Sequence, residues 1–432
     1  MTFSVSILAT GSELLDGRVV DTNSNFVARE LSQIGLKLKR VLLVDDDMDE
    51  LLAGLSSLSA VSQIVITSGG LGPTSDDLTR DFIAKFFKLG VQEYPQARQH
   101  LEAFYAKRGR ALDDSNLKQA FLPEGSTMIP NELGTAPGFI MQGPGGGPHP
   151  VTVCSLSGVP REFYAMFHSV VFPLIRSQAG TVTPIVRKPF RTFGVPESVA
   201  GKIVHGCNLP SDVIVSYRAA FPEVHVVLKA PEGVDLEGPA RQVREALGAG
   251  VIYTEDADQS LVQKVQALLR ARSSTVATAE SCTGGMIATQ LTETPGSSEV
   301  FKGSVVAYDN AVKRDLLHVP QETLESHGAV SAETVRAMAA EARRVLGTTY
   351  GVATSGIAGP GGGSDEKPVG LFYVGVSGPT RSFELRCVYG SERRSVRTYA
   401  TYVALDLLRR ELEGLEIPDT YPVLGGVVAP KA

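Results

Sequence analysis

The stretch Ala279-Glu280-Ser281-Cys282-Thr283-Gly284-Gly285 joins an apolar, β-prone run at 275–278 to a run that can be helical from Met286. A hydroxyl at this junction lies beside unpaired backbone N–H groups and the positive end of a helix dipole. We therefore expect the junction to suit an oxyanion or a phosphate. The simpler alternative is that Ser281 or Thr283 only caps the helix.

Similar strand–loop–helix units recur along the chain. Apolar runs that predict strands end in glycine-rich or acidic loops, and segments with helical periodicity follow them. Such repeated units are typical of an α/β fold with a doubly wound, mostly parallel sheet, whose ligands bind beyond the carboxyl ends of the strands. The clearest strands lie at 5–9, 38–44, 64–67, 151–154 and 350–354, and the clearest helices at 23–31, 161–167 and 331–346.

The chain has 432 residues, which is too long for one ordinary hydrophobic core. The pattern predicts an α/β domain at 1–175, a small α+β unit at 176–255, a second α/β domain at 256–416, and a flexible tail at 417–432. In the middle unit, two alternating strands flank a short Phe-Pro turn, and two helices accompany them.

Composition excludes several classes of protein. Apolar residues make up 43% and charged residues 20%, which indicates a soluble globular protein. The net charge of -6 gives no reason to expect a nucleic-acid binder. No apolar run reaches membrane-spanning length, and the start lacks the charged region of a signal peptide. The four cysteines lie far apart, so we expect neither a zinc site nor disulfides, and a cytoplasmic location.

Carboxylates follow several predicted strands of the first domain. Glu13, Asp45, Asp76 and Asp77 all lie in loops after strands, and carboxylates are the side chains that hold Mg²⁺ or a similar cation beside phosphates. The backbone of 69–72, Gly-Gly-Leu-Gly, can cradle a phosphate. The alternative is that these are solvated loop carboxylates that cap helices.

Eight sequence pieces, in the same order, resemble those of the CinA family (competence/damage-inducible protein A), and the resemblance covers nearly the whole chain. A single glycine-rich loop would be weak support, whereas eight ordered pieces are specific. In the first domain they are Gly11–Leu15, Asp21-Thr22-Asn23, Gly69–Asp77 and Gly134–Phe139, and in the last domain Ala279–Gly285, Tyr308-Asp309-Asn310, Gly328–Ser331 and Ser355–Pro360.

The resemblance implies a bifunctional enzyme of pyridine-nucleotide recycling. The first domain is similar to molybdopterin-binding proteins of the MoaB/MogA type, and the family associates it with metal-dependent hydrolysis of ADP-ribose to AMP and ribose 5-phosphate. The last domain resembles PncC, which converts nicotinamide mononucleotide (NMN) to nicotinate mononucleotide and ammonia. The middle unit resembles a KH-type fold, but a G-x-x-G loop and a basic face are missing, so we interpret it as a spacer or dimer element. The family suggests a homodimer.

The family motif implies roles for residues of the last domain. Ser281 is the expected nucleophile, Lys313 the base, and Tyr308 a proton relay or an orienting group. The base must be neutral, hence partly buried or close to another cation, whereas an ordinary lysine is solvated. Cys282 is the rival nucleophile, because a helix N-terminus would lower the pKa of its thiol. The expected substrate-binding residues are Thr283, Gly284, Ser298, Ser355, Gly356 and Arg393, with Arg393 or Arg394 on the 5′-phosphate.

The resemblance also implies roles in the first domain. Asp77 and Asp45 align with two functional aspartates of MogA-like proteins, and they are the expected catalytic residues. The expected metal ligands are Asp77, Asp76, Asp45 and Glu13, and the expected phosphate-binding residues are Gly69, Gly70, Gly72 and Thr74. Asn116, Gln119 and Glu162 also match family positions, without an assigned role.

Two alternatives to this bifunctional enzyme remain open. In one, the last domain is the deamidase and the first is an inert or pterin-binding module. In the other, the chain is an interaction protein of competence or DNA repair, which leaves the hydroxyl, lysine and glycine-loop arrangement unexplained.

Overall fold

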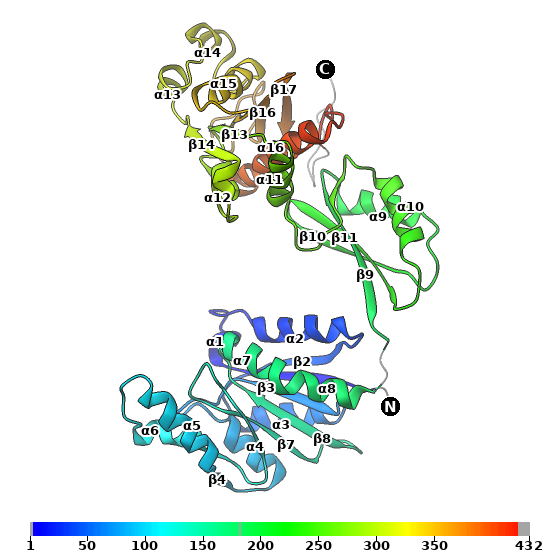
Figure 1. Ribbon diagram of the computed structural model, residues 1–432, viewed down its shortest axis with the longest axis vertical. Helices are drawn as coiled ribbons and strands as arrows, with labels where there is room; N and C mark the ends of the chain where they lie inside the picture. The colour runs from blue at the N-terminus through cyan, green and yellow to red at the C-terminus, as the bar shows by residue number, and fades with distance from the viewer. Residues whose placement is uncertain (1–2, 181–182, 422–432) are drawn as a thin grey trace. The chain divides into compact units, whose positions relative to one another are not determined.

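The computed structural model describes residues 3–180 and 183–421 (Figure 1). Contacts between Cα atoms divide the chain into two compact units, residues 1–185 and 186–432. The second unit contains two separate sheets. No helix of the described residues is long and apolar enough to cross a membrane.

The first unit is built on a six-stranded sheet in the order β2-β1-β3-β8-β7-β6. The neighbours from β2 to β8 pair in parallel, and β7 and β6 add an antiparallel edge. This confirms the predicted doubly wound, mostly parallel arrangement. The strands are β1 (Val5–Thr10), β2 (Leu38–Val44), β3 (Ile64–Ser68), β6 (Thr127–Ile129), β7 (Gly138–Pro144) and β8 (Pro150–Leu156), and a separate pair is β4 (Val91–Glu93) with β5 (Phe121–Pro123).

Both faces of this sheet are buried, because alternate residues of each strand pack into different clusters. Ile7 and Ile66 lie in the cluster under α2, α7 and α8, whereas Leu8 and Val65 lie in the cluster under α3 and α4 (Figure 1). Strands buried on both sides are typical of parallel sheets between helical layers. The helices are α1 (Ser12–Leu15), α2 (Thr22–Gln33), α3 (Met48–Ser59), α4 (Thr79–Phe87), α5 (Pro95–Ala106), α6 (Asp114–Leu117), α7 (Pro160–Met166) and α8 (Phe172–Ala179).

The second unit begins with a four-stranded sheet in the order β10-β11-β9-β12. The two predicted strands are present as β10 (Ile214–Ala220) and β11 (Glu223–Pro231), which pair antiparallel. The two predicted helices are α9 (Glu197–His205) and α10 (Glu237–Leu247), and they share one hydrophobic cluster with the sheet. The strands β9 (Ile185–Phe193) and β12 (Ile252–Thr254), which the sequence pattern did not predict, complete the α+β unit.

The larger sheet of the second unit has the order β14-β13-β15-β16-β17. The first three strands are parallel to one another, and the last two are antiparallel to their neighbours. Its elements are α11 (Leu261–Ala271), β13 (Val276–Glu280), α12 (Met286–Thr292), β14 (Phe301–Val306), α13 (Asn310–Asp315), α14 (Gln321–His327), α15 (Ala332–Val345), β15 (Tyr350–Gly356), β16 (Leu371–Ser377), β17 (Ser382–Val388) and α16 (Arg393–Glu413).

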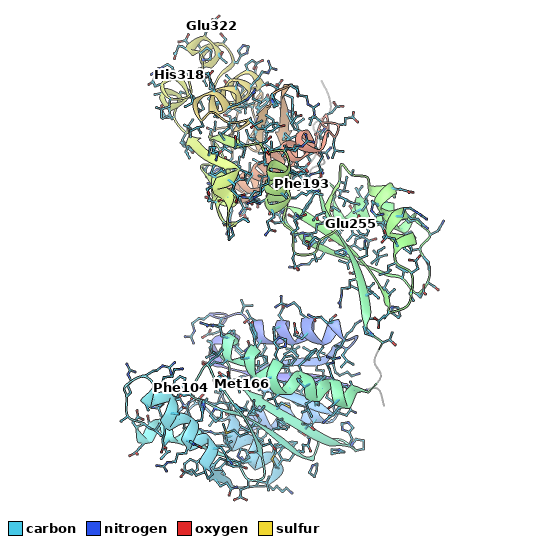
Figure 2. All side chains as sticks on the ribbon, in the orientation of Figure 1. Phe104, Met166, Phe193, Glu255, His318 and Glu322 are labelled. Atoms are coloured by element: carbon cyan, nitrogen blue, oxygen red, sulfur yellow. The ribbon has the colours of Figure 1, made fainter. Side chains whose placement is uncertain are left out.

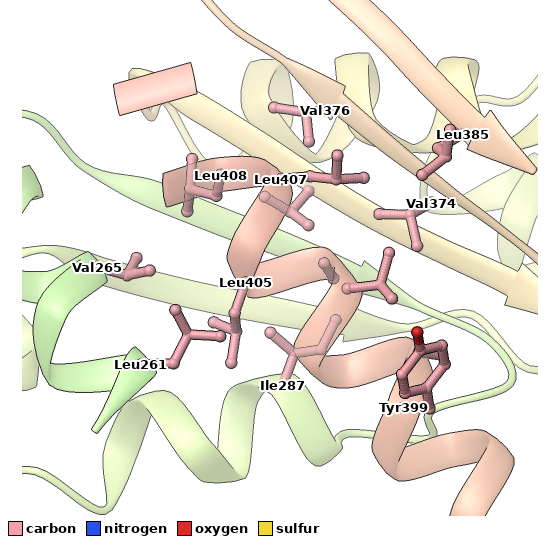
Figure 3. Packing of buried hydrophobic residues seen from close by; sticks show 14 of the residues in the cluster. Leu261, Val265, Ile287, Val374, Val376, Leu385, Tyr399, Leu405, Leu407 and Leu408 are labelled. Atoms are coloured by element: carbon pink, nitrogen blue, oxygen red, sulfur yellow. The ribbon is translucent and has the colours of Figure 1, made fainter. Parts of the chain in front are cut away.

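Helices cover both faces of this sheet. On one face, α11, α12 and α16 bury large aliphatic side chains against β16 and β17, as Figure 3 shows for Leu261, Ile287, Leu405 and Val374. On the other face, Met338 of α15 packs against small alanines of the central strands. The sheet is therefore held rigidly, and its strand ends are fixed points for the loops that follow them.

The start of the predicted tail is anchored in the core. Tyr421 is buried beside Phe193 (labelled in Figure 2), and its hydroxyl donates to Asp406 Oδ2 at 2.5 Å. This corrects the expectation of a flexible segment at Tyr421, because an apolar ring with a bonded hydroxyl is stable inside a core. The remainder of the predicted tail, 422–432, lies outside the described residues.

Candidate active sites

Three parallel strands of the second unit end at one place. Glu280, the last residue of β13, lies opposite Val306 of β14 and Thr354 of β15 in the sheet register. The chain then continues in the same direction, since the Ser281 N–H donates to the Thr354 carbonyl at 3.0 Å. Ser281 therefore lies between the loops that follow β14 and β15.

These loops enclose a pocket of about 190 Å³. It brings together six of the predicted residues, namely Ser281, Tyr308, Lys313, Ser355, Gly356 and Arg393, and Cys282 and Asn310 also line it. Thr283, Gly284, Ser298 and Arg394 do not belong to the lining. A pocket below the usual 300–1,000 Å³ of small-molecule sites encloses only part of a mononucleotide and leaves the rest at its mouth.

The Ser281 hydroxyl is available for chemistry. The side chain is 8% exposed, and its oxygen has no hydrogen-bond partner within residues 3–180 and 183–421. Gly284 and Gly285 have φ of 59° and 92°, a left-handed backbone that reverses the chain before α12 begins. The hydroxyl does not cap the helix, so the simpler interpretation of Ser281 does not hold.

Lys313 has the environment that a neutral base requires. It lies on α13 with only 1% of its surface exposed, and its Nζ donates to the Tyr308 carbonyl at 3.2 Å. Burial lowers the pKa of the Lys313 amine, and the nearby Asp309 carboxylate opposes this shift. The alternative of a solvated helix lysine is therefore wrong.

The mouth of the pocket carries a tyrosine and an arginine. Tyr308 is 63% exposed, and its hydroxyl accepts a hydrogen bond from Arg393 Nη2 at 3.2 Å. Arg393 Nη1 donates to the Gly359 carbonyl at 2.8 Å, which ties the first turn of α16 to the loop after β15. A guanidinium held in this way presents a fixed positive charge at the mouth.

Several predicted substrate-binding residues have structural partners instead. The hydroxyl of Thr283 is fully buried between Glu280 Oε2 at 2.8 Å and Thr354 Oγ1 at 2.7 Å. Ser298 lies on a separate 3₁₀ turn, where its carbonyl accepts from Lys302 Nζ at 3.0 Å. The hydroxyl of Ser355 lines the pocket but donates to Ala329 O at 2.6 Å.

The N-terminus of α12 does not offer the unpaired N–H groups that we expected from the sequence. The N–H groups of Gly285, Ile287 and Ala288 donate to the Glu280 carboxylate at 2.9, 3.0 and 2.9 Å. An anion from solution cannot use donors that a buried side chain already occupies. The sequence interpretation missed Glu280, although a glutamate four residues before the Gly-Gly pair at a helix start was a visible signal.

The expectation for the Cys282 thiol also needs correction. Burial raises its pKa to about 12, with a smaller contribution in the same direction from Glu280. The helix dipole does not lower this pKa as expected, since the positive helix end is occupied by the Glu280 carboxylate. A thiol that stays protonated is a poor nucleophile.

A second pocket, of about 540 Å³, lies in the first unit. It is lined by the loops that follow β1, β2, β3 and β8, which are the carboxyl ends of parallel neighbours. Of the predicted residues, Glu13, Gly69, Gly70, Gly72, Asp76 and Asp77 line it, whereas Asp45 and Thr74 do not.

Asp77 shapes the glycine loop of this pocket. Its Oδ1 accepts from the Gly72 N–H at 2.8 Å, and its Oδ2 accepts from the Thr74 N–H at 2.8 Å and from the Thr74 hydroxyl. Gly69 has a φ of 104°, and a Cβ there would lie 2.7 Å from the Thr10 carbonyl oxygen. The loop therefore requires both the carboxylate and the glycine. Hydrogen bonding to Thr74 also lowers the pKa of the exposed Asp76.

The structure places Asp46, rather than Asp45, against the pocket. Asp46 accepts from the Thr10 hydroxyl at 2.5 Å and from the Ser12 N–H at 3.3 Å. Asp45 is exposed, and its Oδ1 accepts from the N–H of Asp46 at 2.9 Å. Both residues lie in the loop after β2, and only Asp46 lines the pocket.

The charged side chains of the described lining of this pocket are all acidic. Its described lining has no lysine, arginine or histidine, but it includes the carboxylates of Glu13, Asp21, Asp46, Asp76, Asp77 and Glu162. No three His, Cys, Asp or Glu side chains among the described residues lie close enough to hold a metal by themselves. Oxygen donors alone fit Mg²⁺, which proteins commonly bind through one or two carboxylates together with substrate phosphates.

Two buried amide oxygens of this pocket lack partners among residues 3–180 and 183–421. Asn23 Nδ2 donates to Ser68 Oγ and to the Gly158 carbonyl, both at 2.9 Å, which fixes the orientation of the amide, and its Oδ1 has no partner. Gln119 Oε1 is likewise buried and unpartnered. Glu162 is held by Asn131 and Ser157, each at 2.8 Å. A ligand with hydroxyl or amino donors would satisfy the two free acceptors. Asn116, in contrast, is partly exposed, and its side chain bonds to Asp113.

Comparisons with known proteins match both ends of the chain. Residues 258–412 match the family described as CinA C-terminal domain, and residues 6–177 match the probable molybdopterin binding domain. A CinA-like protein of Rippkaea orientalis is 39% identical over 419 residues, which cover 95% of this chain and 99% of the relative. A CinA-like protein of Anaeromyxobacter dehalogenans is 41% identical over 415 residues, covering 94% of this chain and 99% of the relative. The crystal structure of competence/damage inducible protein CihA from Agrobacterium tumefaciens is 41% identical, with a TM-score of 0.35, and covers 35% of this chain and 93% of that one.

Proposed function

Because the chain belongs to the CinA family, we propose that its carboxy-terminal part hydrolyses the carboxamide of NMN to nicotinate mononucleotide and ammonia. One observation carries this proposal: an unpartnered serine hydroxyl and a buried amine of lowered pKa line the same pocket. A nucleophile beside a base is the arrangement that amide hydrolysis requires.

In the proposed reaction, Ser281 Oγ attacks the carboxamide carbon while the neutral Lys313 amine accepts the hydroxyl proton. The resulting ammonium group then gives this proton to the departing nitrogen, and ammonia leaves. Water hydrolyses the acyl-serine ester by the same route, with Lys313 as base, and nicotinate mononucleotide leaves. Tyr308 and Arg393 at the mouth would hold the ribose 5′-phosphate, because the pocket is too small for the whole nucleotide.

Release of ammonia from NMN by the purified chain tests the proposal directly. Nicotinamide riboside and glutamine are the comparison substrates, since the first lacks the phosphate and the second lacks the ring. Equal rates with all three would contradict a nucleotide-specific site. Release of no ammonia from any of them would favour the alternative of an interaction protein.

We also infer that the amino-terminal pocket splits the diphosphate of ADP-ribose into AMP and ribose 5-phosphate with a divalent metal such as Mg²⁺. Six carboxylates and no cationic side chain line it, so a diphosphate anion enters only with cations that offset this repulsion. One or two of the lining carboxylates Asp46, Asp77, Glu13 and Asp76 would hold the metal together with the substrate phosphates. When bound, the metal would neutralise the phosphates and make a bound water more acidic. The glycine loop would orient the diphosphate through its backbone N–H groups.

Calorimetry of ADP-ribose binding distinguishes this enzyme from a pterin-binding module. We expect binding in Mg²⁺ and at least about a tenfold loss of affinity in EDTA, because the carboxylate lining repels the unaccompanied anion. AMP production in Mg²⁺ is the second measurement. Binding without turnover would support the alternative of a non-catalytic first domain.

A further inference from the structure

Glu280 is a fully buried carboxylate directly before the proposed nucleophile. Every hydrogen-bond partner of its two oxygens is a donor that belongs to the strand ends or to the turn and helix that follow. Oε2 accepts from Thr283 Oγ1 (2.8 Å), Gly285 N (2.9 Å) and Ile287 N (3.0 Å), and Oε1 from Ala288 N (2.9 Å), Thr278 Oγ1 (3.4 Å) and Ser304 Oγ (3.4 Å).

These bonds join both ends of the reactive turn through one side chain. Glu280 is fixed in β13 before the turn, and its carboxylate holds the first residues of α12 after it. Thr283, inside the turn, is held from the same oxygen and from Thr354 of the next strand. The segment between these attachments carries Ser281 and Cys282, so Glu280 helps to fix the direction of both side chains, together with the bond from the Ser281 N–H to the Thr354 carbonyl.

The carboxylate also changes the electrostatics of the turn. It accepts hydrogen bonds from the first N–H groups of α12, so that the positive end of this helix does not stabilise another anion in the turn. The charged or titratable groups that act on the Cys282 thiol are Glu280, which precedes it by two residues, and Lys313, which lines the same pocket. Arg397 of α16 donates to the Thr283 carbonyl at 2.7 Å and adds a positive charge on the other side of the turn.

We propose that Glu280 is a positioning residue: its carboxylate locks the turn that presents the Ser281 hydroxyl, and by occupying the N-terminus of α12 it withholds this helix end from the adjacent Cys282 thiol. The part concerning Ser281 rests on the proposed deamidase function. The part concerning Cys282 does not, because the ionisation of a thiol is measurable without any substrate.

The test uses the full chain with Glu280→Gln, Glu280→Asp and the matched control Glu322→Gln. Glu280→Gln removes the charge at nearly constant size, and Glu280→Asp keeps the charge but shortens its reach. Glu322 is an exposed glutamate at the start of α14 in the same unit (labelled in Figure 2), so its variant removes a charge far from the turn. The rate of alkylation by iodoacetamide is followed from pH 7 to pH 11 by mass spectrometry of the Cys282 peptide. The partly exposed Cys207 is the internal reference.

In Glu280→Gln, we expect the pH dependence of the Cys282 alkylation rate to move to lower pH by about one unit or more. The pH dependence of the Cys207 alkylation rate should stay unchanged. In both Glu280 variants, kcat for NMN deamidation should fall at least about tenfold, because the turn that carries Ser281 moves. KM should stay within about threefold of the wild-type value, because Tyr308 and Arg393 at the mouth of the pocket do not move. Glu280→Asp leaves the Cys282 profile unchanged, and Glu322→Gln changes neither measurement.

The inference is overturned if the pH dependence of Cys282 alkylation in Glu280→Gln matches that of the wild type. It is also overturned if Cys207 alkylation shifts by the same amount as Cys282 alkylation. If circular dichroism shows that Glu280→Gln does not fold, Glu280→Asp decides instead, and a wild-type kcat in that variant overturns it. If the wild-type chain releases no ammonia from NMN, the proposed function fails, while the alkylation profiles still decide whether Glu280 controls the turn.

Discussion

The amine of Lys313 donates to the backbone carbonyl of Tyr308 at 3.2 Å, five residues earlier in the chain. Burial lowers the pKa of this amine, and a neutral acceptor supports its charged form less than a carboxylate would. The pairing thus links the two residues that the family motif places in the reaction.

Replacement of Lys313 should lower the activity and raise the thermal stability. We expect Lys313→Met to lose at least about 100-fold in kcat for NMN deamidation, because no base remains. Its Tm at pH 7 should rise by about 2 °C, since a buried amine is replaced by an apolar side chain of similar length. Calorimetry and the ammonia assay measure the two effects, and a lowered Tm would contradict the assignment of a buried amine that destabilises the fold.

The Lys313 amine also determines how the folding stability and the activity change with pH. The folded state holds the Lys313 pKa below its unfolded value, so the unfolded state binds more protons between the two values. The stability contributed by this group therefore increases as pH rises through that window and stays constant above it. kcat/KM for NMN should rise with pH over the lower part of the same window, and Lys313→Arg should abolish this limb.

Ser281→Ala and Cys282→Ala decide which side chain is the nucleophile. We expect Ser281→Ala to lose at least about 1,000-fold in kcat, and Cys282→Ala to keep activity within about threefold, because the buried thiol stays protonated. Trapping of an acyl-enzyme at residue 281 by mass spectrometry is the supporting measurement. Loss of deamidation only in Cys282→Ala would reverse the assignment.

Arg393→Ala tests the phosphate at the mouth of the pocket. We expect KM for NMN to rise at least about tenfold, while hydrolysis of nicotinamide riboside, which lacks the phosphate, stays unchanged. Arg394→Ala is the matched control, because this neighbour is exposed and does not line the pocket. Equal effects on the two substrates would show that Arg393 supports the fold of the loop at Gly359 instead.

In the first unit, the neighbouring aspartates Asp46 and Asp45 form a matched pair. Asp46→Asn should reduce AMP production from ADP-ribose at least about 100-fold, because this carboxylate faces the pocket. Asp45→Asn should retain activity within about threefold. A large loss of AMP production in Asp45→Asn and a small one in Asp46→Asn would indicate that the loop after β2 rearranges when substrate binds.

Asp77→Ala tests whether the two sites are independent. The variant removes the acceptor that holds Gly72 and Thr74, so the glycine loop loses its shape and AMP production should be abolished. NMN deamidation should stay unchanged, since its pocket lies in the other unit. Simultaneous loss of both activities would contradict independent sites.

The strand–loop–helix pattern and the family motifs were readable without the structure, because apolar periodicity and loop chemistry are local properties. They predicted the mostly parallel sheet of the first domain and an α/β fold for the last one, and they placed Ser281 and the Gly69–Gly72 loop at strand ends. The strands β9 and β12 were missed, since their pairing partners are distant in sequence and β12 is short.

Only the tertiary structure decided which of two adjacent candidates faces a ligand. At Asp45-Asp46 the choice follows from the loop after β2, where Asp46 is bonded to Thr10 and Ser12. At Glu280-Ser281 it follows from the register of β13, which buries the Glu280 side chain under the helix and leaves Ser281 at the pocket. The sequence by itself determined which chemical groups reach the strand ends. It did not determine their direction or their partners, because these depend on contacts between segments up to 135 residues apart, as between Asn23 and Gly158.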